Sequence, residues 1–183
     1  MIKNREKISN SNIVNGKITQ TKRLLIQEAD LEDAVFIFEL LNSPNWIEFI
    51  GDRGIRSLKD AEQYIHNSLI KSYCENGFGL YKMLLKKENY KPIGLCGLVK
   101  RTKLDHPDIG FAILPEYEGK GYTYEAAKSI LWYVHSEIKL TTILAITSKE
   151  NFKSQGLLKK LGLKYTNNLQ LETGENELML FSS

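Results

Sequence analysis

Residues 108–129 read DIGFAILPEYEGKGYTYEAAKS, and this stretch predicts a strand, a glycine-bearing turn and the start of a helix. The apolar run over residues 109–114 predicts the strand, which Pro115 ends because proline cannot donate to a strand ladder. The turn Gly119-Lys120-Gly121 follows, and apolar residues at helical spacing predict a helix that begins near Tyr122.

A strand, a glycine turn and a helix N-terminus together can hold an anion. The N–H groups of a first helical turn have no intrahelical partner, and the helix dipole adds partial positive charge there. Glycine lets the backbone approach a phosphate closely because it carries no side chain. The sequence therefore predicts an anion-binding turn at residues 119–123.

Around this unit the rest of the chain predicts one layered domain. Residues 1–20 are polar and are typical of a mobile lead-in, whereas residues 21–183 predict a single domain. Residues 45–57 are less regular, and Pro44 is expected to end the helix before them. Period and turn signals, among them Thr173-Gly174, predict strands at 21–28, 79–86, 92–100, 109–114, 141–147, 163–167 and 178–181. They predict helices at 31–41, 57–75, 122–138 and 151–161. The expected class is α/β (α+β), a mixed and mostly antiparallel central sheet of about seven strands flanked by about four helices.

The composition limits the classes of protein to which the chain can belong. A chain of 183 residues that is 42% hydrophobic and 26% charged is typical of a globular domain. Its net charge of +3 suits a small anionic ligand but is lower than is typical of a nucleic-acid-binding protein. Cys74 and Cys96 lack metal-ligand spacing, there is no signal-peptide pattern, and no apolar run approaches the ~20 residues of a membrane span. We expect a cytoplasmic protein that uses no metal and binds neither nucleic acid nor membrane.

Three phosphate-binding patterns can be compared with the glycine turn. A Walker A loop does not fit, because Lys120 stands between two glycines. A dinucleotide fingerprint fails at its third glycine, where Tyr124 stands, and the turn comes late in the chain. The third pattern is the pyrophosphate turn of acyl-coenzyme A transferases, in which a strand end, a turn and a helix N-terminus wrap the phosphates of the coenzyme.

These residues resemble the GNAT superfamily of N-acetyltransferases, in the branch that includes the ribosomal-protein N-terminal acetyltransferases. The family pattern Q/R-x-x-G-x-G/A falls on residues 118–123, where Gly121 matches the middle glycine while Glu118 and Thr123 depart from the two ends. A second block, residues 151–163, is similar to the family's N-x-x-S and KLGF segment. Similarity also covers residues 21–26, 76–81 and 92–98, so it extends over about residues 21–181.

The resemblance implies direct transfer of an acetyl group from acetyl-CoA to a primary amine of a small molecule or a protein N-terminus. It places pantetheine and thioester along exposed amides near Ile113 and Leu114. Asn151 would hydrogen-bond the pantetheine arm, a role compatible with capping a helix. The pyrophosphate would lie on the backbone of the turn, with a lysine that either adds charge or is simply solvated, at Gly119, Lys120, Gly121, Tyr122 and Thr123.

The catalytic groups are implied less fully. Many relatives carry a tyrosine acid where this chain has Leu158, and in the ribosomal branch a serine like Ser154 is proposed to stabilise the thiolate; such a serine can equally bond the backbone. Asp108 matches an acidic position before the central strand of relatives and is the candidate base, although it can equally be a surface residue. His106 is a weaker candidate, with an ordinary pKa near 6.5.

Trp46 and Phe49 are the candidate substrate-binding residues. With Arg53 they occupy the irregular segment that walls the acceptor site in relatives, and the two aromatic rings can equally pack on the sheet. The alternative function is a catalytically silent acyl-CoA-binding module, and a ribosome-associated factor is a third hypothesis that has only the weak positive charge in its favour. The sequence leaves open which amine is the acceptor and whether the protein is a monomer or a homodimer.

Overall fold

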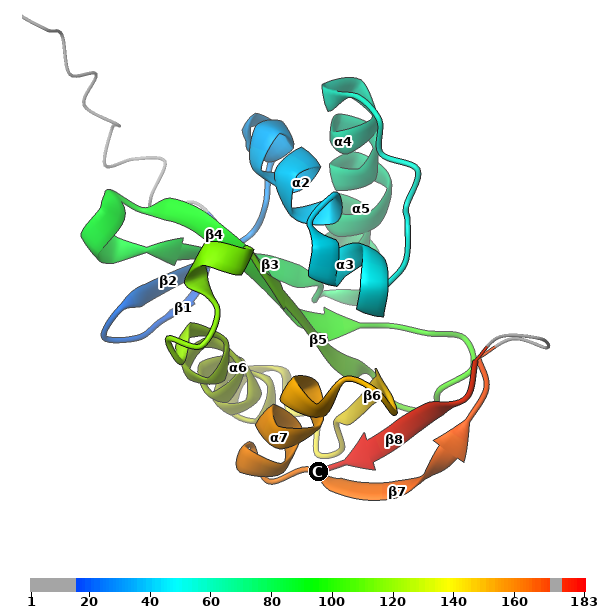
Figure 1. Cartoon of the computed structure of the whole chain (residues 1–183). Coiled ribbons are helices and arrows are strands. Elements are labelled where there is room, and N and C mark those ends of the chain that lie inside the picture. The colour runs from blue at the N-terminus through cyan, green and yellow to red at the C-terminus, as the bar shows by residue number, and fades with distance from the viewer. Residues whose placement is uncertain (1–15, 172–175) are drawn as a thin grey trace, which may run out of the picture.

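A computed structural model describes residues 16–171 and 176–183 as one mixed sheet of eight strands with helices on both faces (Figure 1). The strands lie side by side in the order β1-β2-β3-β4-β5-β6-β8-β7. All neighbours are antiparallel except β5 and β6. Their bounds are β1 Lys17–Gln20, β2 Leu24–Gln27, β3 Leu80–Leu85, β4 Lys91–Val99, β5 Asp108–Ile113, β6 Leu144–Ser148, β7 Lys164–Leu169 and β8 Leu178–Ser182. The predicted α/β (α+β) class and its mostly antiparallel sheet are confirmed.

β1 is the strand that the sequence pattern did not predict. It lies in the stretch expected to be a lead-in, and it pairs antiparallel with β2, with Gln20 opposite Leu25. Its four residues alternate too weakly between apolar and polar to be recognised without the neighbouring strand. Residues 1–15 of the expected lead-in and the expected turn at Thr173-Gly174 lie outside the described residues.

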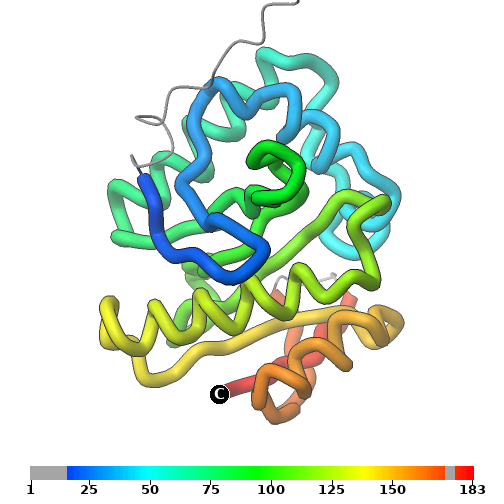
Figure 2. Tube along the Cα trace, turned by 90° about the vertical axis from the view of Figure 1, so that its left-hand side faces the viewer, coloured from blue at the N-terminus to red at the C-terminus, as the bar shows by residue number. Residues whose placement is uncertain are grey.

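The helices form two layers. α2, α3, α4 and α5 lie on one face of the sheet, and α6 and α7 lie on the other (Figures 1 and 2). Their bounds are α2 Ala34–Leu41, α3 Pro44–Phe49, α4 Leu58–Tyr64, α5 Lys71–Asn76, α6 Tyr122–Tyr133 and α7 Phe152–Lys160. Short 3-10 turns cover Leu31–Asp33, Lys86–Glu88 and Pro115–Tyr117, and π-helical turns cover Ile65–Ile70 and Val134–Ile138.

α3 corrects the expectation of an irregular segment after Pro44. Pro44 occupies the first turn of a new helix, where its missing N–H costs nothing and its fixed φ suits the helical conformation. Proline therefore both ends α2 and begins α3. The helix carries Trp46 into the hydrophobic core, where only 3% of the residue is exposed.

A buried lysine attaches the start of the α2 region to the sheet. Lys82 of β3 places its ammonium 2.7 Å from an oxygen of Asp33 and 3.1 Å from one of Asp30. Asp30 and Asp33 also form a reciprocal capping box at the 3-10 turn that leads into α2. Lys82 therefore contacts both carboxylates of this cap. Burial raises the pKa of the Asp33 carboxyl and outweighs Lys82, which lowers it.

Candidate active site

The centre of the site is a parallel strand pair, β5 and β6, that separates soon after it forms. Asp108 and Leu144 are the one residue pair of their ladder within the described chain. From there β5 follows β4 as far as Ile113, whereas β6 follows β8 as far as Ser148. The second half of β5 therefore has one edge with no neighbouring strand among the residues that the structure describes.

The ladder between β4 and β5 shows which backbone groups lie on this free edge. The Leu114 N–H donates to the carbonyl oxygen of Ile93 at 2.9 Å. In an antiparallel ladder every second residue turns its N–H and C=O toward the same neighbour, so those of Phe111 and Ile113 face away from β4. The expectation that the Leu114 amide is exposed is corrected, because its N–H is bonded to β4 and its side chain is buried, whereas the amide of Phe111 faces the free edge.

β5 leads directly into the glycine turn. Gly119 and Gly121 have φ angles of 69° and 75°, in the left-handed region that side chains disfavour. A Cβ atom on Gly119 would meet no other atom within 4 Å, so the space beside the turn is open. The first bond at the start of α6 runs from the Glu125 N–H to the Gly121 carbonyl, which leaves the N–H groups of residues 121–124 without a helical partner. Free N–H groups beside open space fit a phosphate or pyrophosphate.

The side chains of the turn point elsewhere. The Lys120 ammonium donates to the carbonyl oxygen of Glu116 at 2.6 Å, so it folds back over the turn. The Tyr122 ring is buried, with the guanidinium carbon of Arg23 4.4 Å from its centre. Thr123 is half-buried. Tyr122 can therefore offer a ligand its backbone N–H but not its side chain.

The N-terminus of α7 carries the two residues of the second sequence block. The Asn151 side-chain oxygen accepts the Ser154 N–H at 3.0 Å, so asparagine caps the helix as expected. This cap uses the oxygen and leaves the NH₂ group of Asn151 to donate elsewhere. Ser154 is half-buried in the first turn, and Leu158 is buried in the core.

Glu118 joins the turn to both α3 and α7. One carboxylate oxygen accepts from the side-chain amide of Asn45, and the other lies 2.9 Å from the ammonium of Lys153. The turn, α3 and the first turn of α7 are thereby brought together. Sequence reasoning missed this link, although the departure of Glu118 from the Gln or Arg of the family pattern was a visible signal.

Asp108 lies where β5 and β6 meet, and it is not a surface residue. Its carboxylate is 2% exposed and accepts from the Arg101 Nε–H at 2.9 Å. Burial raises the pKa of Asp108, and this effect outweighs the charge and hydrogen bond of Arg101, which lower it. His106 is exposed in the preceding loop.

The residues expected to line the acceptor site, Trp46 and Phe49, differ in exposure. Trp46 is buried, and its indole N–H has no hydrogen-bond partner among the described residues. Phe49 is half-buried and Arg53 is exposed. Within the described ranges, no three His, Cys, Asp or Glu side chains lie where they could hold a metal ion together. Over the same residues no helix combines the length and apolar character needed to cross a membrane.

The arrangement as a whole defines a class of enzyme. A strand edge with free amides can receive an extended amide-bearing chain, and the glycine turn at its end can receive a pyrophosphate. A helix N-terminus with a hydrogen-bonding asparagine and serine lies beside the turn. These features suit the two chemical parts of coenzyme A, an amide-bearing arm and a pyrophosphate, and such an arrangement is typical of acyl-coenzyme A transferases.

Comparison with known proteins identifies the family. Residues 23–164 match the family model described as an acetyltransferase (GNAT) domain. The uncharacterized N-acetyltransferase YnaD of Bacillus subtilis (strain 168) is 31% identical over 144 residues, which cover 79% of this chain and 81% of that protein. The spermidine N(1)-acetyltransferase of Escherichia coli (strain K12) is 32% identical over 81 residues, or 42% of this chain and 44% of the enzyme.

Among solved structures, the fold is similar to that of RimL, a ribosomal L7/L12 alpha-N-protein acetyltransferase in complex with coenzyme A. The TM-score is 0.78 at 10% identity, over 91% of this chain and 97% of RimL. The chain belongs to the GNAT acetyltransferase family and is an acetyl-CoA-dependent acyltransferase. The family expected from the glycine turn is confirmed, and the comparisons give no support to the silent binding module.

Proposed function

We propose that the protein transfers the acetyl group of acetyl-CoA directly to a primary amine of a small molecule or of a protein N-terminus. One observation carries the proposal: the free edge of β5 runs into a glycine turn with unpartnered N–H groups, beside the N-terminus of α7. A slot of this kind suits a thioester at one end and a pyrophosphate at the other.

The coenzyme would be held mostly by backbone groups. The amides of Phe111 and Ile113 suit the two amide groups of pantetheine, and the asparagine NH₂ of Asn151 adds a donor from the opposite side. The N–H groups at Gly119, Lys120, Gly121, Tyr122 and Thr123 suit the pyrophosphate. The ammonium of Lys120 is near enough in sequence to join them once it leaves the carbonyl of Glu116.

In the reaction, a C–N bond forms to the acetyl carbon and the C–S bond of the thioester breaks. Acetyl-CoA supplies the activated acyl group. The amine must be neutral to attack, and free amines have pKa values from roughly 7.7 to 10.4, so a group that accepts a proton helps. Asp108 is our candidate, because it lies at the closed end of the slot and its pKa is raised by burial.

Ser154 is our candidate for the group that stabilises the leaving thiolate. Its hydroxyl lies in the first turn of α7, where the free N–H groups and the dipole also favour negative charge. The hydroxyl proton donates to sulfur, and Leu158, at the position of the tyrosine acid of many relatives, has no proton to give.

The acceptor would enter on the side of α3. Trp46 and Phe49 are the proposed wall residues, and the unpartnered indole N–H of Trp46 is a donor that an acceptor carbonyl or a water molecule can use. Relatives that act on spermidine and on a protein α-amine both use primary amines, which supports the amine class without choosing between its members.

The test is a screen of the purified protein with acetyl-CoA against polyamines, amino acids, aminoglycosides and peptides with free N-termini. We expect release of the coenzyme thiol and a mass increase of one acetyl group on at least one acceptor. Tight binding of acetyl-CoA with no thiol release on any acceptor would contradict acetyl transfer and favour the silent module.

A further inference from the structure

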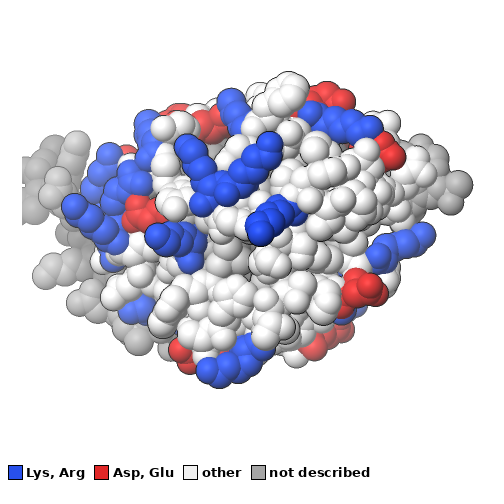
Figure 3. All heavy atoms as spheres, turned by 90° about the horizontal axis from the view of Figure 1, so that it is seen from below, with Lys and Arg blue, Asp and Glu red and all other residues white. Residues whose placement is uncertain are grey.

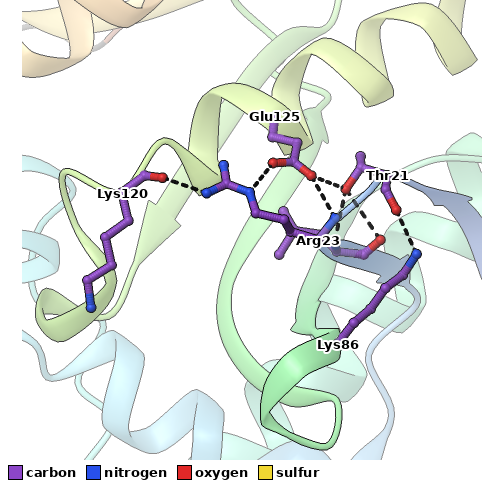
Figure 4. Close-up of polar contacts among 6 residues, drawn as sticks. Thr21, Arg23, Lys86, Lys120 and Glu125 are labelled. Carbon is purple, nitrogen blue, oxygen red and sulfur yellow. Dashed lines mark hydrogen bonds and ion pairs between the residues drawn. The ribbon is translucent and has the colours of Figure 1, made fainter.

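Residues 21–23, just before β2, form a polar network with the glycine turn (Figure 4). Two of its members are far apart in the chain: Arg23 lies between β1 and β2, and Glu125 lies in the first turn of α6. Figure 4 shows the Arg23 guanidinium between the Glu125 carboxylate and the carbonyl of Lys120. The network therefore lies on the side of the turn to which the Lys120 carbonyl points.

A carboxylate in the first turn of α6 would by itself compete with an anionic ligand. The oxygens of Glu125 are, however, already occupied. One accepts the Thr21 hydroxyl at 2.5 Å and the Arg23 backbone N–H at 2.9 Å, and the other accepts the Arg23 Nε–H at 2.5 Å. Burial raises the pKa of Glu125, but these hydrogen bonds outweigh burial and hold that pKa below its usual range. Glu125 is thus an anchor for Arg23 and is turned away from a ligand at the turn.

The anchored guanidinium also fixes the central peptide of the turn. Arg23 Nη1 donates to the Lys120 carbonyl oxygen at 2.9 Å, and its carbon lies 4.4 Å from the centre of the Tyr122 ring. A trans peptide is planar, and its C=O and N–H point in opposite directions. Since the Lys120 carbonyl points at Arg23, the N–H of Gly121 points away from Arg23, toward the ligand side of the turn.

We propose that Arg23 is a positioning residue for the coenzyme: anchored by Glu125, it holds the Lys120 carbonyl and so aims the Gly121 N–H at the pyrophosphate. The proposal rests on the proposed function, since it concerns the same turn. Arg23 acts through the backbone of the turn and is not itself a ligand of the phosphates.

The experiment compares the affinity of the wild-type protein for coenzyme A with that of Arg23→Gln and Arg23→Lys, by calorimetry. Arg23→Gln should weaken binding on the order of tenfold or more, the scale of a lost hydrogen bond to a charged donor. Arg23→Lys should not restore it, because one ammonium cannot reach both Glu125 and the Lys120 carbonyl. Lys71→Gln, which removes an exposed ion pair on α5, is the matched control and should bind normally.

Two further measurements separate positioning from other roles. The KM for acetyl-CoA should rise in Arg23→Gln, whereas kcat at saturating acetyl-CoA and the KM for the amine should stay unchanged, measured at a temperature where circular dichroism shows the variant folded. The loss of affinity should also persist at high salt, because hydrogen-bond geometry is not screened as a direct attraction between charges is.

Three outcomes would overturn the proposal. Full affinity for coenzyme A in a folded Arg23→Gln variant would show that binding does not depend on Arg23 orienting the Gly121 N–H. Full rescue by Arg23→Lys, or a loss of affinity that disappears at high salt, would show that charge alone matters. A wild-type protein that binds no coenzyme A would remove both this proposal and the proposed function, whereas the other outcomes leave the proposed function standing.

Discussion

Individual residues of the site divide into those that act through the backbone and those that act through a side chain. Gly119, Gly121 and Tyr122 offer a ligand N–H groups only, since two are glycines and the tyrosine ring is buried. Ser154 and Asp108 are the side chains that we propose take part in the reaction. Substitutions at these two positions therefore test the mechanism, while glycine substitutions test the location of the coenzyme.

Ser154→Ala should lower kcat more than it raises the KM for acetyl-CoA. Loss of one neutral hydrogen bond to the leaving sulfur corresponds to a drop in kcat on the order of tenfold. Steady-state kinetics check this, with Ser129→Ala as control, because Ser129 lies on α6 and its hydroxyl is hydrogen-bonded to Thr19 of β1. An unchanged kcat would remove Ser154 from the mechanism.

Asp108 should make stability depend on pH. Its pKa is raised in the folded state, from an ordinary value of 3.8, so folding favours the protonated form. The stability that this group contributes is therefore fully present at pH values below about 4 and is lost as pH rises through the raised pKa. Each unit of difference between the folded and unfolded pKa is worth about 1.4 kcal/mol.

Urea unfolding of the wild type and of Asp108→Asn, from pH 3 to pH 7, measures this contribution. The free energy of unfolding of the wild type, relative to the variant, should fall as pH rises. Asp105→Asn, an exposed aspartate of the same loop, is the control. A relative stability that rises with pH would mean that Arg101 outweighs burial.

At the scale of elements, the sequence pattern predicted what is local and missed what depends on distant partners. The strand, glycine turn and helix of residues 108–129 were read correctly because their period and turn residues are contiguous. The strand β1 was missed because it is defined by its pairing with β2. The helix α3 was missed because proline can follow the end of one helix and also occupy the first turn of the next.

The same limit applies to the site. The contacts of Arg23 with Glu125 and of Glu118 with Asn45 join segments far apart in the chain, and no spacing rule reports them. The expectation that the Leu114 amide is exposed was wrong, because its N–H bonds to Ile93, and which amides face the free edge depends on the register with β4. The family resemblance picked out the glycine turn in the sequence. Only the fold shows that Arg23 and Asn45 contact this turn.

Glu118→Gln should strengthen acetyl-CoA binding at low salt by about threefold, the scale of one nearby charge in a solvated site. The substitution removes a negative charge next to the pyrophosphate turn, and it releases the ammonium of Lys153. Calorimetric titration checks this, with Glu75→Gln on α5 as control. Weaker binding in Glu118→Gln would show that the link between the turn, α3 and α7 matters more than its charge.

For the molecule as a whole, the excess of positive charge attracts an anionic co-substrate. The chain carries a net charge of +3, and Lys and Arg side chains are more frequent than Asp and Glu on the face that bears α6 and α7 (Figure 3). Exposed lysines on these helices include Lys128, Lys153, Lys159 and Lys160. A basic face around the slot raises the local concentration of a polyanion and speeds its capture.

Consequently kcat/KM for acetyl-CoA should fall as KCl rises from about 0.05 to about 0.5 M, because salt screens attraction between exposed charges. Steady-state kinetics in KCl check this, with dephospho-acetyl-CoA, which has less negative charge, as the matched co-substrate. Its salt dependence should be shallower. A flat response for both would mean that the basic face takes no part in capture.

The location of acetyl-CoA at the glycine turn is tested most directly by titrating it into Gly121→Asp. A Cβ atom at residue 121 would lie 3.5 Å from Nη2 of Arg23, and an aspartate would keep the left-handed φ of 75° only with strain, so Gly121→Asp distorts the turn and adds a negative charge beside the pyrophosphate site. Gly77→Asp is the matched control, since Gly77 has a φ of 72° against 75° and lies at the end of α5, away from the turn. We predict that Gly121→Asp folds and binds no acetyl-CoA while Gly77→Asp binds it normally; unchanged affinity in folded Gly121→Asp would contradict the assignment of the site.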